Sequence, residues 1–147
     1  LHAMQDKIDT LKKTASAKQA RIKEVDELLR MVDYYKSGKP AADKLKSIRF
    51  EKSRQKYKSE HDGELRTFYM AERKLKPYFK DGRLPITAWR RERERLEQEY
   101  RDIQTGLAPL HADAKKLWAI HYNIYEVQHE QDRQNAATRQ KKQEIEH

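Results

Sequence analysis

Apolar residues recur at alternating spacings of three and four over the first 35 residues of the chain. The positions concerned are Leu1, Met4, Ile8, Leu11, Ala15, Ile22, Val25, Leu29 and Val32, with Lys18 as the one polar member. A repeat this strict places a narrow apolar stripe along one side of a helix, which is typical of a coiled coil rather than of a helix on a broad core. Gly38 and Pro40 are expected to end this helix, since glycine and proline are common just beyond a helix C-terminus.

The last third of the chain carries the same repeat. One set of seam positions is Trp89, Leu96, Ile103, Leu110, Leu117 and Ile124; the alternate set is Tyr100, Leu107 and Ala114, and Ile120 and Val127 extend the stripe. Beyond Val127 the equivalent positions are polar, so pairing should weaken there. Pro109 lacks an amide hydrogen and should kink this helix near Leu107.

Helix lengths favour pairing of the two repeats within one chain. At about 1.5 Å per residue, a helix of the first 35 residues extends ~52 Å and the run from 86 to 127 extends ~63 Å. We therefore predict an all-α fold, a long antiparallel coiled-coil hairpin whose arms are residues 1–36 and 86–147. Residues 37–85 would form a basic helical cap subdomain inserted between the arms. Association of two chains through the same stripes is the alternative, so both a monomer and a coiled-coil dimer are considered.

The cap is expected to contain short helices and a tight turn. Residues 40–48 should form one short helix, and Ser53 should cap a longer one that bends near Gly63. The Asp81–Gly82 pair is typical of a turn before the last helix. Six aromatic side chains are expected to form a small core: Tyr57, Phe68, Tyr69, Tyr78, Phe79 and Trp89.

Composition argues against a thick globular core. Apolar residues make up 36% of the chain and charged residues 39%, whereas an ordinary soluble domain is ~45–50% apolar and ~25% charged. No apolar run approaches the ~20 residues that cross a bilayer, and the absence of cysteine excludes disulfides and thiolate metal sites. Because the chain opens within the heptad pattern, we interpret it as a piece of a longer, cytoplasmic protein.

Sequence motifs for catalysis are missing. The chain has no glycine-rich phosphate loop, nucleophile elbow or Walker pattern. Glu126 and His129 form one Glu-x-x-His step, but di-iron bundles need two such steps and further carboxylates. His61 beside Asp62 is better explained by packing or capping. We therefore predict a non-enzymatic fragment with no catalytic residues, no metal site and no cofactor.

Positive charge is concentrated in the middle of the chain. The net charge is +9, and residues 36–95 contain nineteen Lys or Arg against nine Asp or Glu, whereas residues 1–35 carry +1 and residues 96–147 carry −2. Two groups stand out. The first basic cluster is Lys44, Lys46, Arg49, Lys52, Arg54, Lys56 and Lys58, and the second basic cluster is Arg90, Arg91, Arg93 and Arg95.

Clustered cations bind nucleic acids because neutralised phosphates release counterions. Both basic clusters are therefore candidate DNA-binding residues, and DNA is the predicted partner. Glu92 and Glu94 interleave the second basic cluster and favour an ordinary ion-pair face there. The alternative function is a coiled-coil scaffold that binds proteins and has no nucleic-acid role.

One segment resembles a known protein family. Arg54, Tyr57, His61, Glu64 and Leu65 fill a basic-x-x-Tyr-x-x-x-His-x-x-Glu-Leu pattern, and a Leu-Pro pair (84–85) and a further coiled-coil helix follow. This arrangement resembles the helical region C-terminal to the nuclease domain of relaxase/mobilisation proteins from Gram-positive conjugative or mobilisable elements, over residues 36–128.

The resemblance implies a parent enzyme that nicks plasmid or transposon DNA at a transfer origin and stays attached to the strand through a tyrosine. The family's metal-binding histidine cluster and N-terminal tyrosine have no counterpart in this sequence. The chain would then be the non-catalytic portion of a relaxase, which helps to hold DNA or contacts relaxosome or secretion-channel coupling proteins during conjugation.

Overall fold

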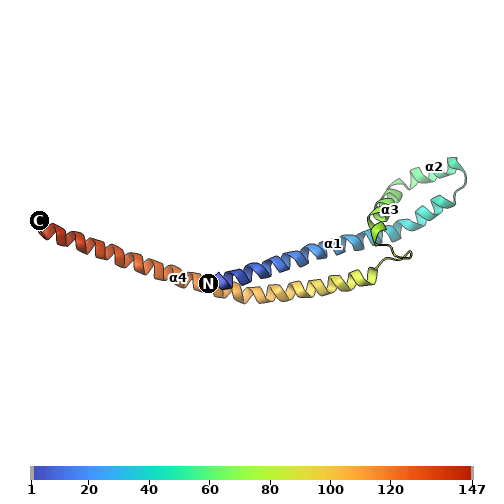
Figure 1. Cartoon of the computed structure of the whole chain (residues 1–147). Helices are drawn as coiled ribbons and strands as arrows, with labels where there is room; N and C mark the ends of the chain where they lie inside the picture. The colour runs from blue at the N-terminus through green and yellow to red at the C-terminus, as the bar shows by residue number, and fades with distance from the viewer. Residues whose placement is uncertain (1, 147) are drawn as a thin grey trace. The chain divides into compact units, whose positions relative to one another are not determined.

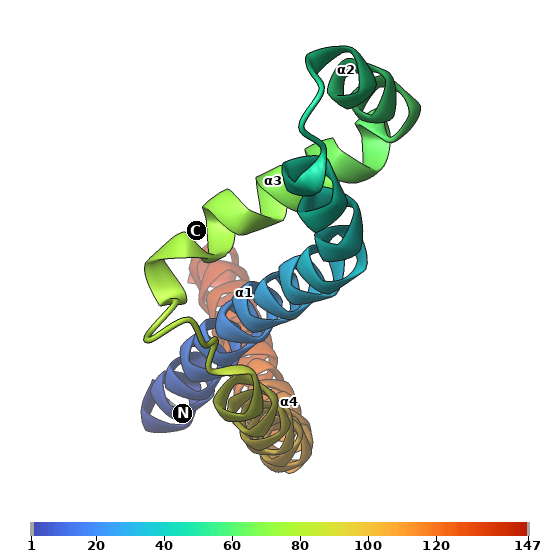
Figure 2. The same ribbon diagram turned by 90° about the vertical axis from the view of Figure 1, so that its right-hand side faces the viewer.

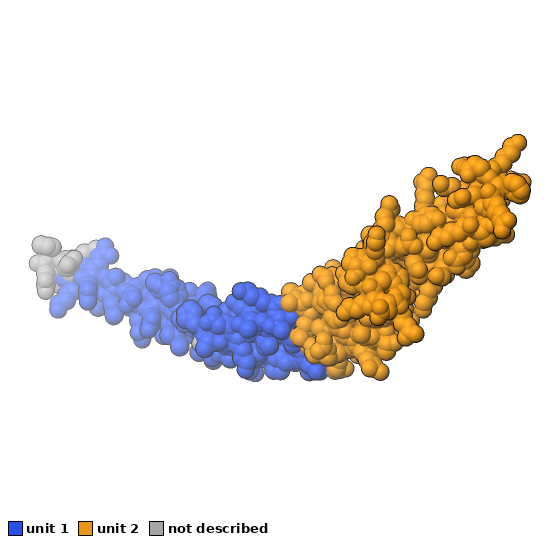
Figure 3. All heavy atoms as spheres, turned by 45° about the vertical axis from the view of Figure 1, so that its right-hand side comes forward, with its two compact units in different colours: residues 1–15, 102–147 blue, residues 16–101 orange. Residues whose placement is uncertain are grey.

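The computed structural model describes the backbone of residues 2–146 and the side chains of residues 2–142. Its elements are α1 (His2–Ser47), α2 (Glu51–Glu60), α3 (Asp62–Leu75), the short 3-10 helix η1 (Lys76–Tyr78) and α4 (Ile86–Glu146) (Figure 1). The chain divides into two compact units, residues 1–15 with 102–147 and residues 16–101 (Figure 3). Within each unit α1 and α4 pack against each other, which confirms the predicted all-α helical hairpin.

The first unit is a two-helix coiled coil. Ile8 on α1 is 1% exposed and packs with Leu107 and Ala114 on α4. Met4, Leu11, Ile103 and Leu110 lie partly buried around these three residues. The predicted seam is therefore confirmed from Met4 to Ala15, while Leu1 lies outside the described residues. Helix α4 stays continuous across Gly106 and Pro109.

Coverage of the α4 seam ends earlier than the sequence predicts. Ala114 is 7% exposed, but Leu117 is 38% exposed and Ile124 is 53% exposed. The prediction that the paired seam extends to Val127 is wrong for the described residues. Among the described residues, the buried contact between α1 and α4 in this unit ends at Ala114.

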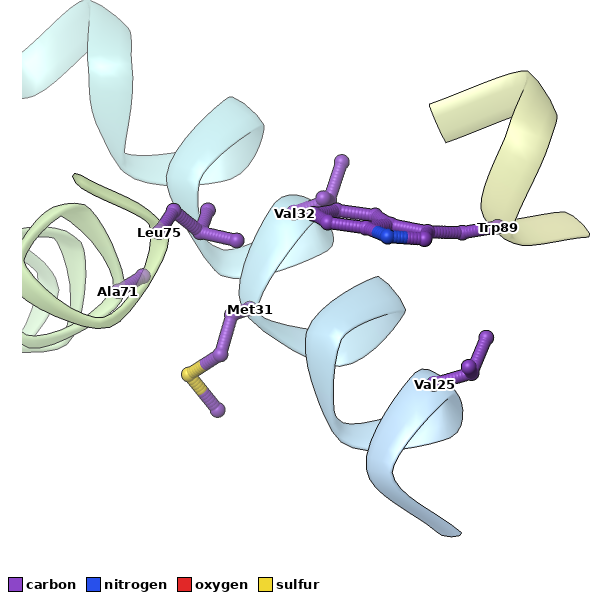
Figure 4. Packing of buried hydrophobic residues seen from close by; sticks show 6 residues of the cluster. All are labelled: Val25, Met31, Val32, Ala71, Leu75 and Trp89. Carbon is purple, nitrogen blue, oxygen red and sulfur yellow. The ribbon is translucent and has the colours of Figure 1, made fainter. Parts of the chain in front are cut away.

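In the second unit, α1 lies between α3 and α4. Val25, Met31 and Val32 of α1 contact Trp89 of α4 on one side and Leu75 and Ala71 of α3 on the other, as Figure 4 shows. Leu75 and Ala71 are fully buried. A second cluster lies further along α1, where Ala41, Ala42 and Leu45 pack against Leu65 and Phe68 of α3.

Helix α1 does not end at Gly38 and Pro40 as the sequence predicts; it runs through both residues to Ser47. A proline inside a helix costs about 3 kcal/mol and a glycine about 1 kcal/mol. Burial of Ala41, Ala42 and Leu45 against α3 offsets this cost. Residues 40–47 are therefore the last turns of α1 rather than a separate helix, and the predicted arm boundary at 36 falls within α1.

Gly38 also permits a close contact between helices. A Cβ atom at this position would lie 2.6 Å from Cβ of Phe68 and 3.3 Å from the carbonyl oxygen of Glu64. Both residues belong to α3, which crosses α1 here (Figure 2). The glycine is needed for helix packing and not for helix termination.

Two further features of the cap are the start of α2 and a tight turn before α4. Helix α2 begins at Glu51 with Phe50 at its N-cap, so the predicted cap by Ser53 is wrong. The turn at Asp81–Gly82 is confirmed: the two residues have φ angles of 52° and 73°, as in a type I′ turn, and Lys80 and Arg83 exchange two backbone hydrogen bonds of 2.9 Å.

No helix in the described part of the chain has an apolar stretch of the length that crossing a bilayer requires.

Candidate nucleic-acid interface

The first basic cluster occupies the end of α1, the short linker after it and α2. All seven of its side chains are exposed, and α2 has no buried residue at all. Within the second unit, this region forms the end of the helical cap (Figure 2). The seven cations are therefore all exposed in one part of the cap.

Helix α2 is held in place by its junction with α3. Tyr57 is the one half-buried residue of α2 and packs against the apolar cluster that contains Leu65 and Phe68. The centre of its ring lies 4.2 Å from the centre of the His61 ring. His61 separates the two helices and its Nδ1 lies 3.4 Å from Glu64 Oε2. Leu65, 3% exposed, completes the junction. The pattern that carries the family resemblance thus forms the α2–α3 corner, with Arg54 left on the exposed side.

Three cations on the coiled coil are paired with carboxylates of the opposite helix. Lys18 Nζ lies 2.6 Å from Glu99 Oε2, and Arg21 Nε lies 2.6 Å from Glu92 Oε1. Arg93 pairs with Asp26 across the helices and with Glu97 along α4. These contacts join α1 to α4 and neutralise charge along the coil.

The first basic cluster differs from these three paired cations. Among the described residues, none of its seven cations forms an ion pair with a carboxylate. Lys44 Nζ lies 5.4 Å from the centre of the Tyr57 ring, a cation–π contact that leaves the positive charge in place. From Lys44 to Lys58 there are seven Lys or Arg against one Glu, a net charge of +6. The cluster is a concentrated, uncompensated positive surface.

The second basic cluster has a different environment. Arg93 is occupied by its two ion pairs, and Arg91 and Arg95 line a shallow depression together with Glu94 and Glu97. Arg90 is exposed. This cluster lies on α4, away from the α2 surface, so the structure does not join the two clusters into one face (Figure 1). Its mixed charge makes it the weaker candidate for polyanion binding.

One exposed residue in this region is not signalled by the heptad analysis. Phe50, in the linker before α2, is 78% exposed, the highest value among the large exposed apolar side chains of the described residues. Its neighbours in the sequence are Arg49 and Glu51. The sequence does contain a signal for Phe50. It is an aromatic residue that lies outside the heptad repeat and within a run of cations. Tyr57 and Tyr78 are less available, because Tyr57 is half-buried and Tyr78 lies edge-on to Trp89 at 5.4 Å.

In the described part of the chain, no three His, Asp or Glu side chains come together as a metal site would require. His129 contacts Tyr125 on its own helix, with ring centres 4.1 Å apart.

No protein-family model, curated protein or solved structure matches this chain.

The ion pairs between α1 and α4 predict a pH dependence of stability. The hydrogen bond from Arg21 lowers the pKa of Glu92 below its ordinary value of 4.5, although burial opposes the shift. A carboxylate with a lowered folded-state pKa stabilises the fold above its unfolded pKa, and this contribution disappears as the pH falls through the folded-state pKa. We expect the wild-type unfolding temperature to fall below about pH 4.5 for this reason.

Substitution of Glu92 isolates this contribution. The Glu92→Gln protein should unfold at a lower temperature than the wild type at pH 7, and the difference should shrink as the pH falls towards 3. Circular dichroism melts across this range measure the effect, with Glu126→Gln, on an exposed part of α4, as the control. A difference that is independent of pH would contradict the assignment.

Proposed function

We propose that this chain is a non-catalytic, cytoplasmic DNA-binding region that assists a conjugative relaxase. The observation that carries the DNA role is the set of seven exposed cations at the end of the cap, none of which is neutralised by a carboxylate among the described residues, whereas Lys18, Arg21 and Arg93 on the coiled coil are. Unpaired clustered cations attract phosphates without first breaking an internal ion pair. The relaxase assignment rests on the resemblance of the Arg54–Leu65 pattern alone.

The arrangement of cations around α2 favours duplex DNA as the ligand. At 100° per residue, Lys52 and Lys56 follow one edge of the solvent-facing side of α2, and Arg54 and Lys58 follow the other edge. Gln55 and Ser59 lie between the two edges, opposite the side on which Tyr57 packs inward. A helix with cations on both edges suits a major groove, which admits a helix between two phosphate backbones.

Fluorescence anisotropy with labelled DNA tests this proposal. We expect the protein to bind a duplex more tightly than a single strand of the same length and the same sequence as one of its strands. Both affinities should fall as salt rises from about 50 to 200 mM, because neutralised phosphates release counterions. No binding at the lowest salt concentration, or binding that is unaffected by salt, would rule out the DNA role.

A coiled-coil scaffold that binds protein partners, such as relaxosome or secretion-channel coupling proteins, is the second candidate. Exposed apolar side chains along α4 beyond Ala114 favour it. Under this alternative, reversal of charge on α2 would leave partner binding intact, whereas polar substitutions on α4 would abolish it. The two functions use different surfaces and can be tested separately.

A further inference from the structure

The part of α4 beyond Ala114 carries an apolar stripe that nothing in the described structure covers. The stripe consists of Leu117, Trp118, Ile120, Ile124, Tyr125 and Val127. Leu117 is 38% exposed and the other five are between 52% and 59% exposed. Contiguous large apolar side chains on a helix surface mark an interaction site, because their exposure to water is unfavourable.

The stripe continues an interface that the chain already uses. Leu117 and Ile124 occupy the same heptad position as Ile103 and Leu110, which pack against α1 in this unit. Helix α4 therefore carries one seam, covered as far as Ala114 and uncovered after it.

The residues beside the seam change character at the same point. Where α1 covers α4 in this unit, the flanking positions are polar or small and exposed: Gln104, Gly106, His111 and Asp113. Beyond Ala114 the equivalent positions are Trp118, Ile120, Tyr125 and Val127. Apolar flanking positions broaden the contact face of a coiled coil, as expected where a further helix packs against it.

The stripe is complementary to itself when two copies run antiparallel. Its two heptads share one pattern: an aliphatic seam residue, an aromatic on one flank and a β-branched residue on the other. In an antiparallel pair, the aromatic flank of one copy meets the aromatic flank of the other, and the β-branched flank meets the β-branched flank. Each seam position of one kind, such as His121, faces a seam position of the other kind, such as Ile124. Trp118 of one copy then lies near Tyr125 of the other, Ile120 lies near Val127, and His121 packs opposite Ile124.

The polar ends of the stripe limit the length of this pairing. With the two-fold axis between Tyr122 and Asn123, Leu117 of one copy lies opposite Gln128 of the other, and Ala114 lies opposite Gln131. The seam of each copy turns polar from Gln128 onward, through Gln131, Gln134 and Thr138. The apolar contact is therefore concentrated in residues 118–127 of each copy.

We propose that the α4 segment 115–130 pairs antiparallel with the same segment of a second copy of this chain. Continuity with the intrachain seam and the self-complementary order of its side chains support this occupant. The proposal does not depend on DNA binding, which involves a different unit of the chain.

Sedimentation velocity over a range of protein concentrations tests the pairing. The wild type should shift from monomer to dimer as concentration rises. The double variant Ile120→Glu/Ile124→Glu should dimerise at least about 100-fold more weakly, because pairing would bury unpaired charge. Both residues are more than half exposed, so the variant should keep the helicity of the wild type.

Ala119→Glu/Asn123→Glu is the matched control. It adds the same charge at the same spacing, on the side of α4 opposite the stripe, and should dimerise like the wild type. A wild type that stays monomeric at all concentrations, or stripe and control variants that behave alike, would overturn the proposal.

Disulfide cross-linking tests the antiparallel direction, since the natural chain has no cysteine. When the His121→Cys and Ile124→Cys proteins are mixed and oxidised, the mixed cross-linked dimer should predominate, because these two seam positions face each other in the antiparallel pair. Parallel pairing would instead join each variant to itself, and predominance of those products would overturn the antiparallel arrangement.

Discussion

Replacement of Gly38 by valine is expected to lower the free energy of unfolding by about 3 kcal/mol, the upper end of the usual cost of overpacking. A Cβ atom at this position would meet Cβ of Phe68 at 2.6 Å and the carbonyl oxygen of Glu64 at 3.3 Å. Neither atom is the flexible end of a side chain, so α1 and α3 would have to separate. This separation would also loosen Leu45 and Leu65, which share the cluster with Phe68.

Gly106 provides the matched control because it lies inside a helix and a Cβ atom added there would have no neighbouring atom within 4 Å. Gly106→Ala should raise the free energy of unfolding by about 0.5–1 kcal/mol through helix propensity alone. Gly38→Ala should lower the same quantity, although the residue change is identical. Urea denaturation followed by circular dichroism measures both, and equal effects at the two sites would contradict the packing assigned to Gly38.

Charge reversal on α2 is expected to abolish DNA binding. The variant Lys52→Glu/Arg54→Glu/Lys56→Glu/Lys58→Glu changes the net charge of the exposed helix by eight units without touching a buried residue. Loss of four phosphate contacts and repulsion by four new carboxylates should weaken duplex binding by more than about 1,000-fold at low salt. Anisotropy titration measures this loss, and the circular dichroism spectrum should be retained.

A control with the same change in net charge separates local from global electrostatics. Lys7, Lys12, Lys13 and Lys23 are exposed on α1 and lie outside both basic clusters. Their joint replacement by glutamate should weaken DNA binding far less than reversal on α2. Similar losses in the two variants would show that net charge, and not the first basic cluster, governs binding.

The coiled-coil seam was predictable from the sequence because it depends on local periodicity. Ile8, Val25 and Trp89, all assigned to the seam from their spacing, are at most 5% exposed. The course of α1 through Gly38 and Pro40 was not predictable in this way. It depends on Phe68 and Leu65, which are distant in sequence and whose contact with α1 no local pattern specifies.

The cations of the candidate site were predictable from the sequence, but the ion pairs that some of them form with carboxylates were not. Arg54 and Arg93 both lie among other cations in the sequence, and only the interleaved Glu92 and Glu94 indicate an ion-pair face around Arg93. In the structure Arg93 is bound by Asp26 and Glu97, and Asp26 comes from the other long helix. A cation's availability therefore depends on tertiary contacts. Exposure of Leu117 and Ile124 likewise depends on whether another helix covers them rather than on their own spacing.

The most direct test of the DNA-binding surface is the salt dependence of duplex affinity for the wild type and for Lys52→Gln/Arg54→Gln/Lys56→Gln/Lys58→Gln. Each phosphate contact contributes about −0.9 to the slope of log affinity against log salt concentration. If α2 lies between the two backbones, the neutralised variant should have a slope less steep by about 3–4. An unchanged slope would mean that these four cations do not contact phosphates and would contradict the proposed function.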